Sequence, residues 1–402
     1  MTTATLNKAN LMAPEVIKTI EQRSLVIGVL GAAASIVGFF VSRENFYSAY
    51  LISFMDLLGL SLGCMAILML YHLVGGKWGT VIRRFIEAGM TPLPLMAVLF
   101  VPILLAVHRI YPWAMPGHVA ETPVKASIEA GYLNANGFVI RFVIYFAIWI
   151  VMAYFLNRWS AEQDTPEGGA RSTLRFRALS GPGILIYSFS ISFAVIDWVM
   201  SLQAHWISTI YGFIFIAGQA LAAFSFAVLI EAILVKRKPL SDYLTPTEVH
   251  DHGKLMLAFV MVWAYFSYSQ WLIMWAGNLP DEISWFLRRI HGGWGYVGIV
   301  LAAFHFGVPF ALLLSRPLKR KTTTLVWVAS WLLIMRWVDI WWHVEPAPPF
   351  GHASVHFSWL HIVTFLGMGG FWTAYFCRSL RARPLLAVYA PQTIKHMESH
   401  HG

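Results

Sequence analysis

Charged residues are scarce in this sequence: Asp, Glu, Lys and Arg make up 12% of the 402 residues, whereas hydrophobic residues make up 58%. Soluble domains carry about 25% charged residues. The composition therefore excludes an ordinary water-soluble enzyme and a disordered chain. Cysteine is almost absent as well. Cys64 and Cys377 stand in apolar runs, which excludes a disulfide framework and any iron–sulfur or zinc site built from clustered cysteines.

Other motifs are missing too. The sequence has no C-x-x-C-H for attaching c-type haem and no glycine-rich phosphate-binding motif. Its first 23 residues are polar and lack the apolar core of a signal peptide, so we expect the first span to direct insertion. The net charge is +9. In a membrane protein this excess of base belongs to loops on one face, and we expect no nucleic-acid partner.

Long apolar runs are the dominant feature of the sequence. A helix needs about 20 apolar residues to cross about 30 Å of hydrocarbon, and these runs are too long and continuous for barrel strands. The sequence predicts an all-α polytopic membrane protein, with a domain over 24–377 between tails at 1–23 and 378–402. The ten predicted spans are 24–42, 47–73, 91–112, 135–157, 182–203, 208–235, 254–277, 291–315, 322–343 and 353–377.

The distribution of Lys and Arg predicts the orientation. With ten spans, 22 of these residues fall on the side that holds both termini, and six fall on the other side. Cytoplasmic loops carry the excess of basic residues, so we expect both termini in the cytoplasm. The longest loops, 112–134 and 158–181, are too short to form a catalytic domain. We therefore expect no complete catalytic site on this chain alone.

Polar residues inside the spans are the candidates for function, because an ionisable group in lipid costs several kcal/mol unless it is paired or hydrated. Arg336, Asp339 and His343 lie three and four residues apart, on one helix face. Asp56 and Asp197 have no partner visible in the sequence. We predict a discontinuous proton path; a structural Arg336–Asp339 ion pair and interhelical hydroxyl contacts are the alternative. The candidates are Asp56, His72, Asp197, His205, Glu231, Tyr265, Ser267, Tyr268, His305, Arg336, Asp339 and His343.

Histidine spacing offers one cofactor hypothesis. His291 and His305 are fourteen residues apart, which would suit two haems stacked along one helix. A haem in a helix bundle needs histidines on facing helices, and no other span supplies a matching pair. We predict that this chain binds no cofactor or metal of its own.

Five stretches resemble one family. They are residues 197–212 (DWVMSLQAHWISTIYG), 72–79 (HLVGGKWG) with 83–88 (RRFIEA), 91–95 (TPLPL), 265–282 (YFSYSQWLIMWAGNLPDE) and 312–320 (LLLSRPLKR). Together they resemble the NrfD/PsrC-like integral membrane subunits of bacterial alternative complex III. The length suits the F subunit (ActF) better than the longer C subunit. Each stretch alone is weak, and the joint pattern samples most of the chain from the second to the ninth span.

The resemblance implies an architecture and a function. It implies two four-helix bundles, from about 47–203 and 208–343, and two peripheral helices. The implied complex oxidises menaquinol or ubiquinol in the bacterial cytoplasmic membrane and reduces a cytochrome c, a copper protein or an oxidase. Its haem c groups and iron–sulfur clusters lie on partner subunits, beside a homologous ten-span C subunit and membrane lipids.

Two mechanisms and two other protein classes stay open. Within the complex, the chain either conducts protons, which we favour, or binds quinol directly, with a His or carboxylate as proton acceptor. Ten spans with charged residues near the midplane also suit a secondary transporter, although spans broken by Gly or Pro in matching halves are not evident. The last alternative is a purely structural membrane anchor.

Overall fold

The computed structural model describes residues 11–117, 131–165, 167, 173–203, 206–350, 354–387 and 389–394, and these residues form helices without a strand. Ten helical segments among them are long and apolar enough to cross a membrane. The predicted all-α polytopic membrane protein is therefore confirmed. The spans are α1 (Glu15–Val41), α2 (Arg43–Val74), α3 to α5 (Lys77–Met90, Leu93–Leu99, Val101–Leu105), α8 (Ala135–Glu162), α10 (Thr173–Trp198), α11 (Tyr211–Leu234), α13 (Pro246–Gly277), α15, η5 and α16 (Trp294–Leu301, Ala302–Gly307, Val308–Leu314), α18 (Thr322–Val344) and α19 (Trp359–Arg381).

The third span begins earlier than the sequence indicated. We expected it over 91–112 and assigned Arg83 and Arg84 to a loop, whereas the apolar segment covers Lys77–Leu105. Both arginines are buried inside α3, at 2% and 3% exposure. They can lie there because Glu87, one turn further along the same helix, pairs with both guanidinium groups.

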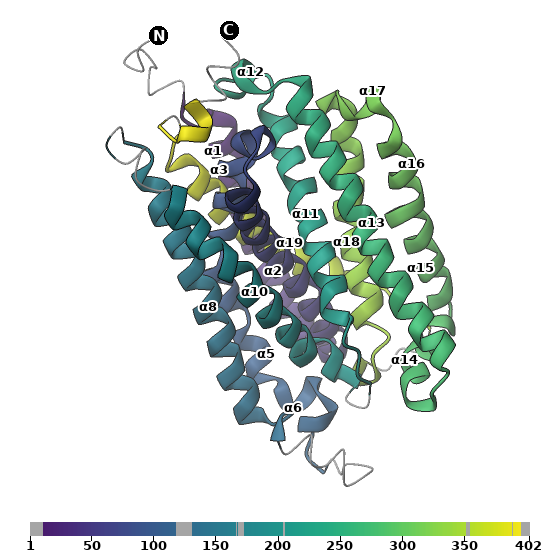
Figure 1. Cartoon of the computed structure of the whole chain (residues 1–402). Coiled ribbons are helices and arrows are strands. Elements are labelled where there is room, and N and C mark those ends of the chain that lie inside the picture. The colour runs from purple at the N-terminus through teal and green to yellow at the C-terminus, as the bar shows by residue number, and fades with distance from the viewer. Residues whose placement is uncertain are drawn as a thin grey trace.

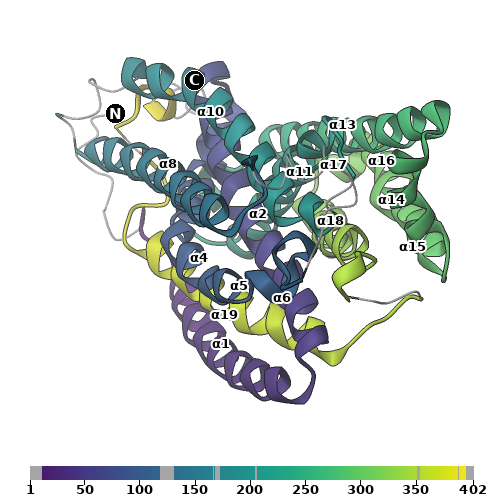
Figure 2. The same cartoon turned by 90° about the horizontal axis from the view of Figure 1, so that it is seen from below.

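The helices form two groups joined along one seam (Figures 1 and 2). In the first group α2 packs on α3, α4 and α10, and α8 packs on α4 and α10. In the second group α11 packs on α13 and α18, and α16 packs on α13 and α18. The seam is formed by α2 packing on α11 and α18 and by α10 packing on α11. Where α2 meets α11, a Cβ atom added to Gly63 would lie 2.1 Å from the Gln219 carbonyl oxygen. Glycine allows this close approach of two backbones.

A third element is the pair of helices nearest the two ends of the chain. The helices α1 and α19 pack along their length at one side of the bundles, in contact with α2 (Figure 2). A Cβ atom on Gly31 would lie 2.5 Å from the Gly367 nitrogen, and one on Gly370 would lie 2.4 Å from the Gly28 nitrogen. Four glycines thus let the two backbones touch, the packing typical of small-residue stripes in membranes.

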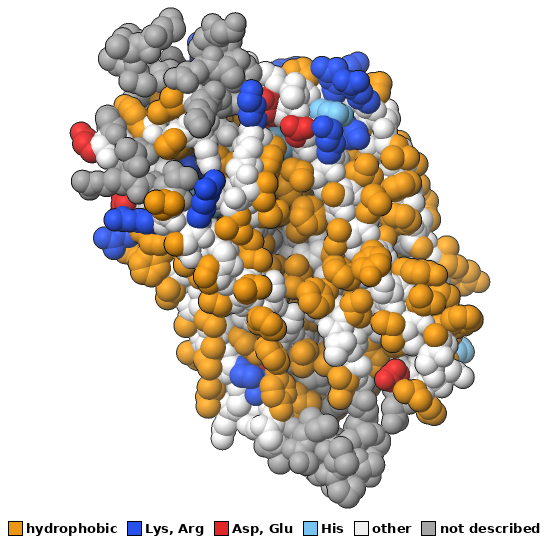
Figure 3. All heavy atoms as spheres, viewed as in Figure 1, with side chains coloured by type: hydrophobic (Ala, Val, Ile, Leu, Met, Phe, Trp, Pro, Cys, Tyr) orange, Lys and Arg blue, Asp and Glu red, His pale blue; other side chains and the backbone are white. Residues whose placement is uncertain are grey.

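The two ends of the bundle differ. We call the end where α1 begins and α19 ends the terminal face; α12 (Leu240–Tyr243) and α17 (Arg316–Lys319) also lie there, whereas α6 (Val107–Ile110) and α14 (Pro280–Ile290) lie at the opposite, far face (Figure 1). In Figure 3 hydrophobic side chains cover a broad middle band, and most visible Lys and Arg side chains gather at the terminal face.

Candidate functional site

The strongest polar cluster lies in the second group of helices, toward the far face. Three predicted residues of α18 meet there, because spacings of three and four residues stack their side chains. The Asp339 carboxylate accepts from the Arg336 guanidinium at 2.5 Å and from the Trp263 indole of α13 at 3.2 Å. Its other oxygen lies 3.5 Å from Nε2 of His343. Asp339 is 1% exposed, so these groups replace the water it would otherwise bind.

The chain of contacts continues through His343. Its Nδ1 lies 3.0 Å from the Tyr211 hydroxyl at the start of α11. Arg289 of α14 donates to the His343 carbonyl oxygen at 2.6 Å and stacks 3.7 Å above the Trp285 ring. Arg289 is almost fully buried, and burial lowers the pKa of its guanidinium to about 9. Arg289 was not among the predicted candidates.

These groups form one wall of a pocket of about 720 Å³ between α11, α13, α14, α15 and α18. We call it the α13–α18 pocket. It is mostly apolar and aromatic, and its ionisable wall is made of Asp339, His343 and Arg289. A largely apolar pocket with a few convergent polar groups is the usual form of a small-molecule site. The main aromatic lining residues are Trp263, Trp271, Trp285, Phe286, Phe306 and Trp342.

Three further candidates lie on the outer wall of the same pocket. Tyr265, Ser267 and Tyr268 of α13 all line it. The two tyrosines are 65% and 59% exposed, so they lie at its lipid-facing opening and away from the buried acid. The predicted α13 hydroxyl run therefore contributes to the pocket, and only Trp263 of this helix reaches Asp339.

His305 stands close to the same acid. It belongs to a π-helical turn, η5, and is fully buried with its ring 4.2 Å from the Trp263 ring. Neither ring nitrogen makes a hydrogen bond of standard geometry to a described residue, and the backbone of Met335 in α18 interacts with the ring. Burying an imidazole without well-formed hydrogen bonds is costly, and this one adjoins the indole that binds Asp339.

A second buried pair lies nearer the terminal face. Nδ1 of His252 in α13 lies 2.9 Å from the Glu231 carboxyl of α11, and both side chains are fully buried. Nε2 of His252 lies 2.7 Å from the Trp78 carbonyl oxygen, which can only accept a hydrogen bond. The His252 imidazole and the Glu231 carboxyl are therefore close enough to exchange a proton, but no hydrogen bond of standard geometry joins them. Glu231 was among the predicted candidates, whereas His252 was not.

A gap separates the two buried groups. Trp263 follows His252 by eleven residues on α13, about 16 Å along the helix axis. Ser225 of α11 is buried in the same group of helices, with a hydroxyl that lacks a partner among the described residues. The predicted path is thus discontinuous in the structure, and a proton crossing this gap would require water.

Asp197 has a separate setting in the first group of helices. Its carboxylate accepts from the Arg141 guanidinium and from the Tyr145 hydroxyl, both on α8 and both at 2.8 Å. The Arg141 guanidinium lies 4.0 Å from the Tyr132 ring centroid. The sequence showed no partner for Asp197, because Arg141 is 56 residues away in the chain.

The other predicted residues are not gathered at the pocket. Asp56 faces a second cavity of about 630 Å³ between α1, α2, α18 and α19. The Arg336 and Asp339 charges act on it from a distance. His72 is buried near the terminal face and stacks on Phe176 at 4.1 Å. His205 lies outside the described residues.

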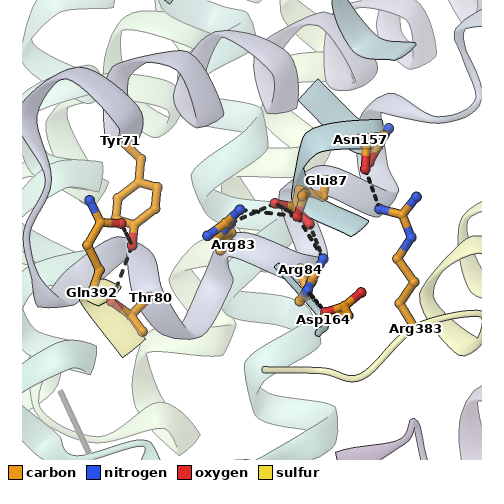
Figure 4. A network of polar contacts seen from close by, with 10 residues as sticks. Tyr71, Thr80, Arg83, Arg84, Glu87, Asn157, Asp164, Arg383 and Gln392 are labelled. Atoms are coloured by element: carbon orange, nitrogen blue, oxygen red, sulfur yellow. Dashed lines mark hydrogen bonds and ion pairs between the residues drawn. The ribbon is translucent and has the colours of Figure 1, made fainter. Parts of the chain in front are cut away.

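A buried ionic network near the terminal face was missed by the sequence analysis (Figure 4). Glu87 accepts from Arg83 at 2.7 Å, from Arg84 at 2.8 Å and from Ser160 of α8 at 2.6 Å. Arg84 also pairs with Asp164. Burial raises the pKa of the Asp164 carboxyl, and the Arg84 charge opposes that effect. The spacing of residues 83, 84 and 87 could have indicated this cluster, since i,i+3 and i,i+4 pairs share a helix face.

Comparisons with known proteins give no assignment: no family model and no curated protein matches this chain. Groups of three or more His, Cys, Asp or Glu side chains that could hold a metal ion are not found within the part of the chain that the structure describes. Asp339 and His343 are the groups of the α13–α18 pocket that can exchange protons.

Proposed function

We propose that this chain is an integral membrane subunit of a quinol-oxidising complex of the alternative complex III type, and that it conducts protons coupled to quinol oxidation. The complex would lie in a bacterial cytoplasmic membrane. The excess of Lys and Arg near the termini favours cytoplasmic termini. Haem c and iron–sulfur centres would belong to partner subunits, and menaquinol or ubiquinol would be the substrate of the complex.

One observation carries the proposal: a buried chain from Arg336 through Asp339 and His343 to Tyr211 borders a membrane-embedded pocket. Histidine and carboxylate side chains exchange protons readily in such settings. His305 and the Glu231–His252 pair extend the set of exchangeable groups toward the terminal face.

A direct quinol site is the second candidate, and the α13–α18 pocket favours it. Its aromatic walls suit a flat ring, and its opening between exposed tyrosines suits a prenyl tail. Oxidation of a hydroquinone releases two protons and two electrons. In this version His343 and Asp339 would accept the protons, and a partner subunit would accept the electrons.

Replacing Glu231 by glutamine tests the proton path. The change removes the carboxylate that lies 2.9 Å from Nδ1 of His252, so we expect proton translocation to fall sharply while quinol oxidation persists. The measurement uses the purified intact complex in proteoliposomes, with proton release and quinol oxidation followed together. Asp251→Asn is the matched control, because Asp251 forms only an exposed pair with Lys254. Unchanged translocation in Glu231→Gln would contradict the path.

Filling the α13–α18 pocket with a larger side chain distinguishes direct quinol binding from proton conduction. Gly298 lines the α13–α18 pocket, and an added Cβ would lie 3.8 Å from the Trp342 ring, an ordinary contact. If quinol binds there, Gly298→Leu should raise the KM for quinol and lower the rate of its oxidation. Gly369→Leu is the control, because Gly369 lines the other cavity with comparable room. Normal quinol kinetics in Gly298→Leu would exclude the pocket as the quinol site.

A further inference from the structure

The eighth span is irregular at the point where it carries His305. Between α15 and α16 the chain forms the π-helical turn Ala302–Gly307. Here the Val308 N–H donates to the Ala303 carbonyl, five residues back. A π turn is rare and needs a local cause. The residue that follows the donor Val308 is Pro309, and a proline has no backbone N–H to donate.

Pro309 therefore leaves one carbonyl without its backbone donor. In the π pattern the Phe304 carbonyl would accept from the N–H of residue 309, and that group does not exist. Trp331 of α18 supplies the replacement: its indole N–H donates to the Phe304 carbonyl oxygen at 2.8 Å. Its ring also meets the Phe304 ring edge-on, with centroids 5.9 Å apart.

The hydrogen bond from Trp331 to Phe304 affects the next residue, His305. His305 follows Phe304 directly, and the π register places its ring against Trp263. A shift of register by one residue would turn a side chain by about 100° around the helix axis. The charge of Arg336 in α18 acts on the His305 ring. A rotation of the His305 side chain would therefore also change the electrostatic potential at its ring.

We propose that Trp331 is a positioning residue that fixes the π turn and so holds His305 beside the Trp263–Asp339 contact. The indole is partly exposed, at 40%, on the lipid-facing side of the span. A donor facing hydrocarbon gains more from a fixed acceptor than one facing water. The role of His305 in proton movement rests on the proposed function; the positioning by Trp331 does not.

The test compares two tryptophans one turn apart on α18. Trp331→Phe keeps the aromatic ring and removes the donor. Trp327→Phe is the control, since Trp327 is 76% exposed and makes no hydrogen bond to a described residue. The loss of one hydrogen bond should lower the population of the π register about fivefold. The measurement is the ¹⁵N spectrum of the His305 ring in labelled complex. We expect a new set of His305 signals in Trp331→Phe and the original set in Trp327→Phe.

A stability measurement guards against a general loss of packing. Trp331→Phe keeps the aromatic ring that meets Phe304, so we expect its unfolding temperature to fall by no more than the loss of one hydrogen bond explains. Unchanged His305 signals in Trp331→Phe, or shifted signals that come with a much larger loss of stability, would overturn the positioning role. If the signals shift but proton translocation does not, Trp331 positions His305 as proposed, and the role of His305 in the proton path is wrong.

Discussion

Asp339→Ala should be among the most damaging single substitutions in this chain. It would leave the Arg336 guanidinium buried, at 3% exposure, without its carboxylate. Removing one partner of a buried ion pair costs about 3–5 kcal/mol. We expect that loss in the free energy of unfolding, measured by thermal unfolding of the purified complex in detergent, together with loss of proton translocation.

A double variant distinguishes a structural role of the Arg336–Asp339 pair from a role in proton translocation. Arg336→Met with Asp339→Leu removes both charges, and apolar replacement of a buried pair is often neutral or stabilising. We expect unfolding close to that of the native protein, with proton translocation still absent. A double variant that both folds and translocates protons would show that the pair is structural only.

Gly63→Ala is expected to have a comparable effect on assembly. An added methyl group would lie 2.1 Å from the Gln219 carbonyl oxygen, and backbone cannot yield as a flexible side chain does. The two helices α2 and α11 would have to move apart at this point, which would loosen the seam between the two groups of helices. We expect a fall in the yield of folded protein and in the unfolding temperature, measured by fluorescence-detected gel filtration.

A matched glycine-to-alanine control should have the opposite effect on stability. Gly369 also lies inside a membrane-spanning helix, and an added Cβ there would meet nothing closer than 4.0 Å. Alanine is favoured over glycine in a helix interior by about 1 kcal/mol. Gly369→Ala should therefore be neutral or slightly stabilising. If Gly63→Ala behaves in the same way, the close contact at the seam is not required.

The spans and one face of α18 were predictable because both depend on periodicity within a single segment. Hydrophobic run length set the ten spans, and spacings of three and four placed Arg336, Asp339 and His343 together. Partners on other helices were not predictable in this way. Arg141 reaches Asp197 from another helix.

The partners of three buried arginines could not be predicted from the sequence. Arg83, Arg84 and Arg289 lie outside the ten predicted spans, where basic residues are usually solvated. Each is buried against partners that only packing reveals, such as Ser160 of α8 or the backbone carbonyls of Trp342 and His343. The roles predicted for the polar residues, by contrast, remain predictions until proton movement is measured.

The pairing of α1 with α19 bears on how the protein is made. During synthesis α1 is made before α19, the helix that covers its glycines at positions 28 and 31. Until translation has passed the glycine at position 370, α1 has only its limited contact with α2 to hold it. A chain that stops before α19 therefore leaves this glycine stripe facing lipid. Such an uncovered stripe is a feature by which quality-control proteases could distinguish unfinished chains from complete ones.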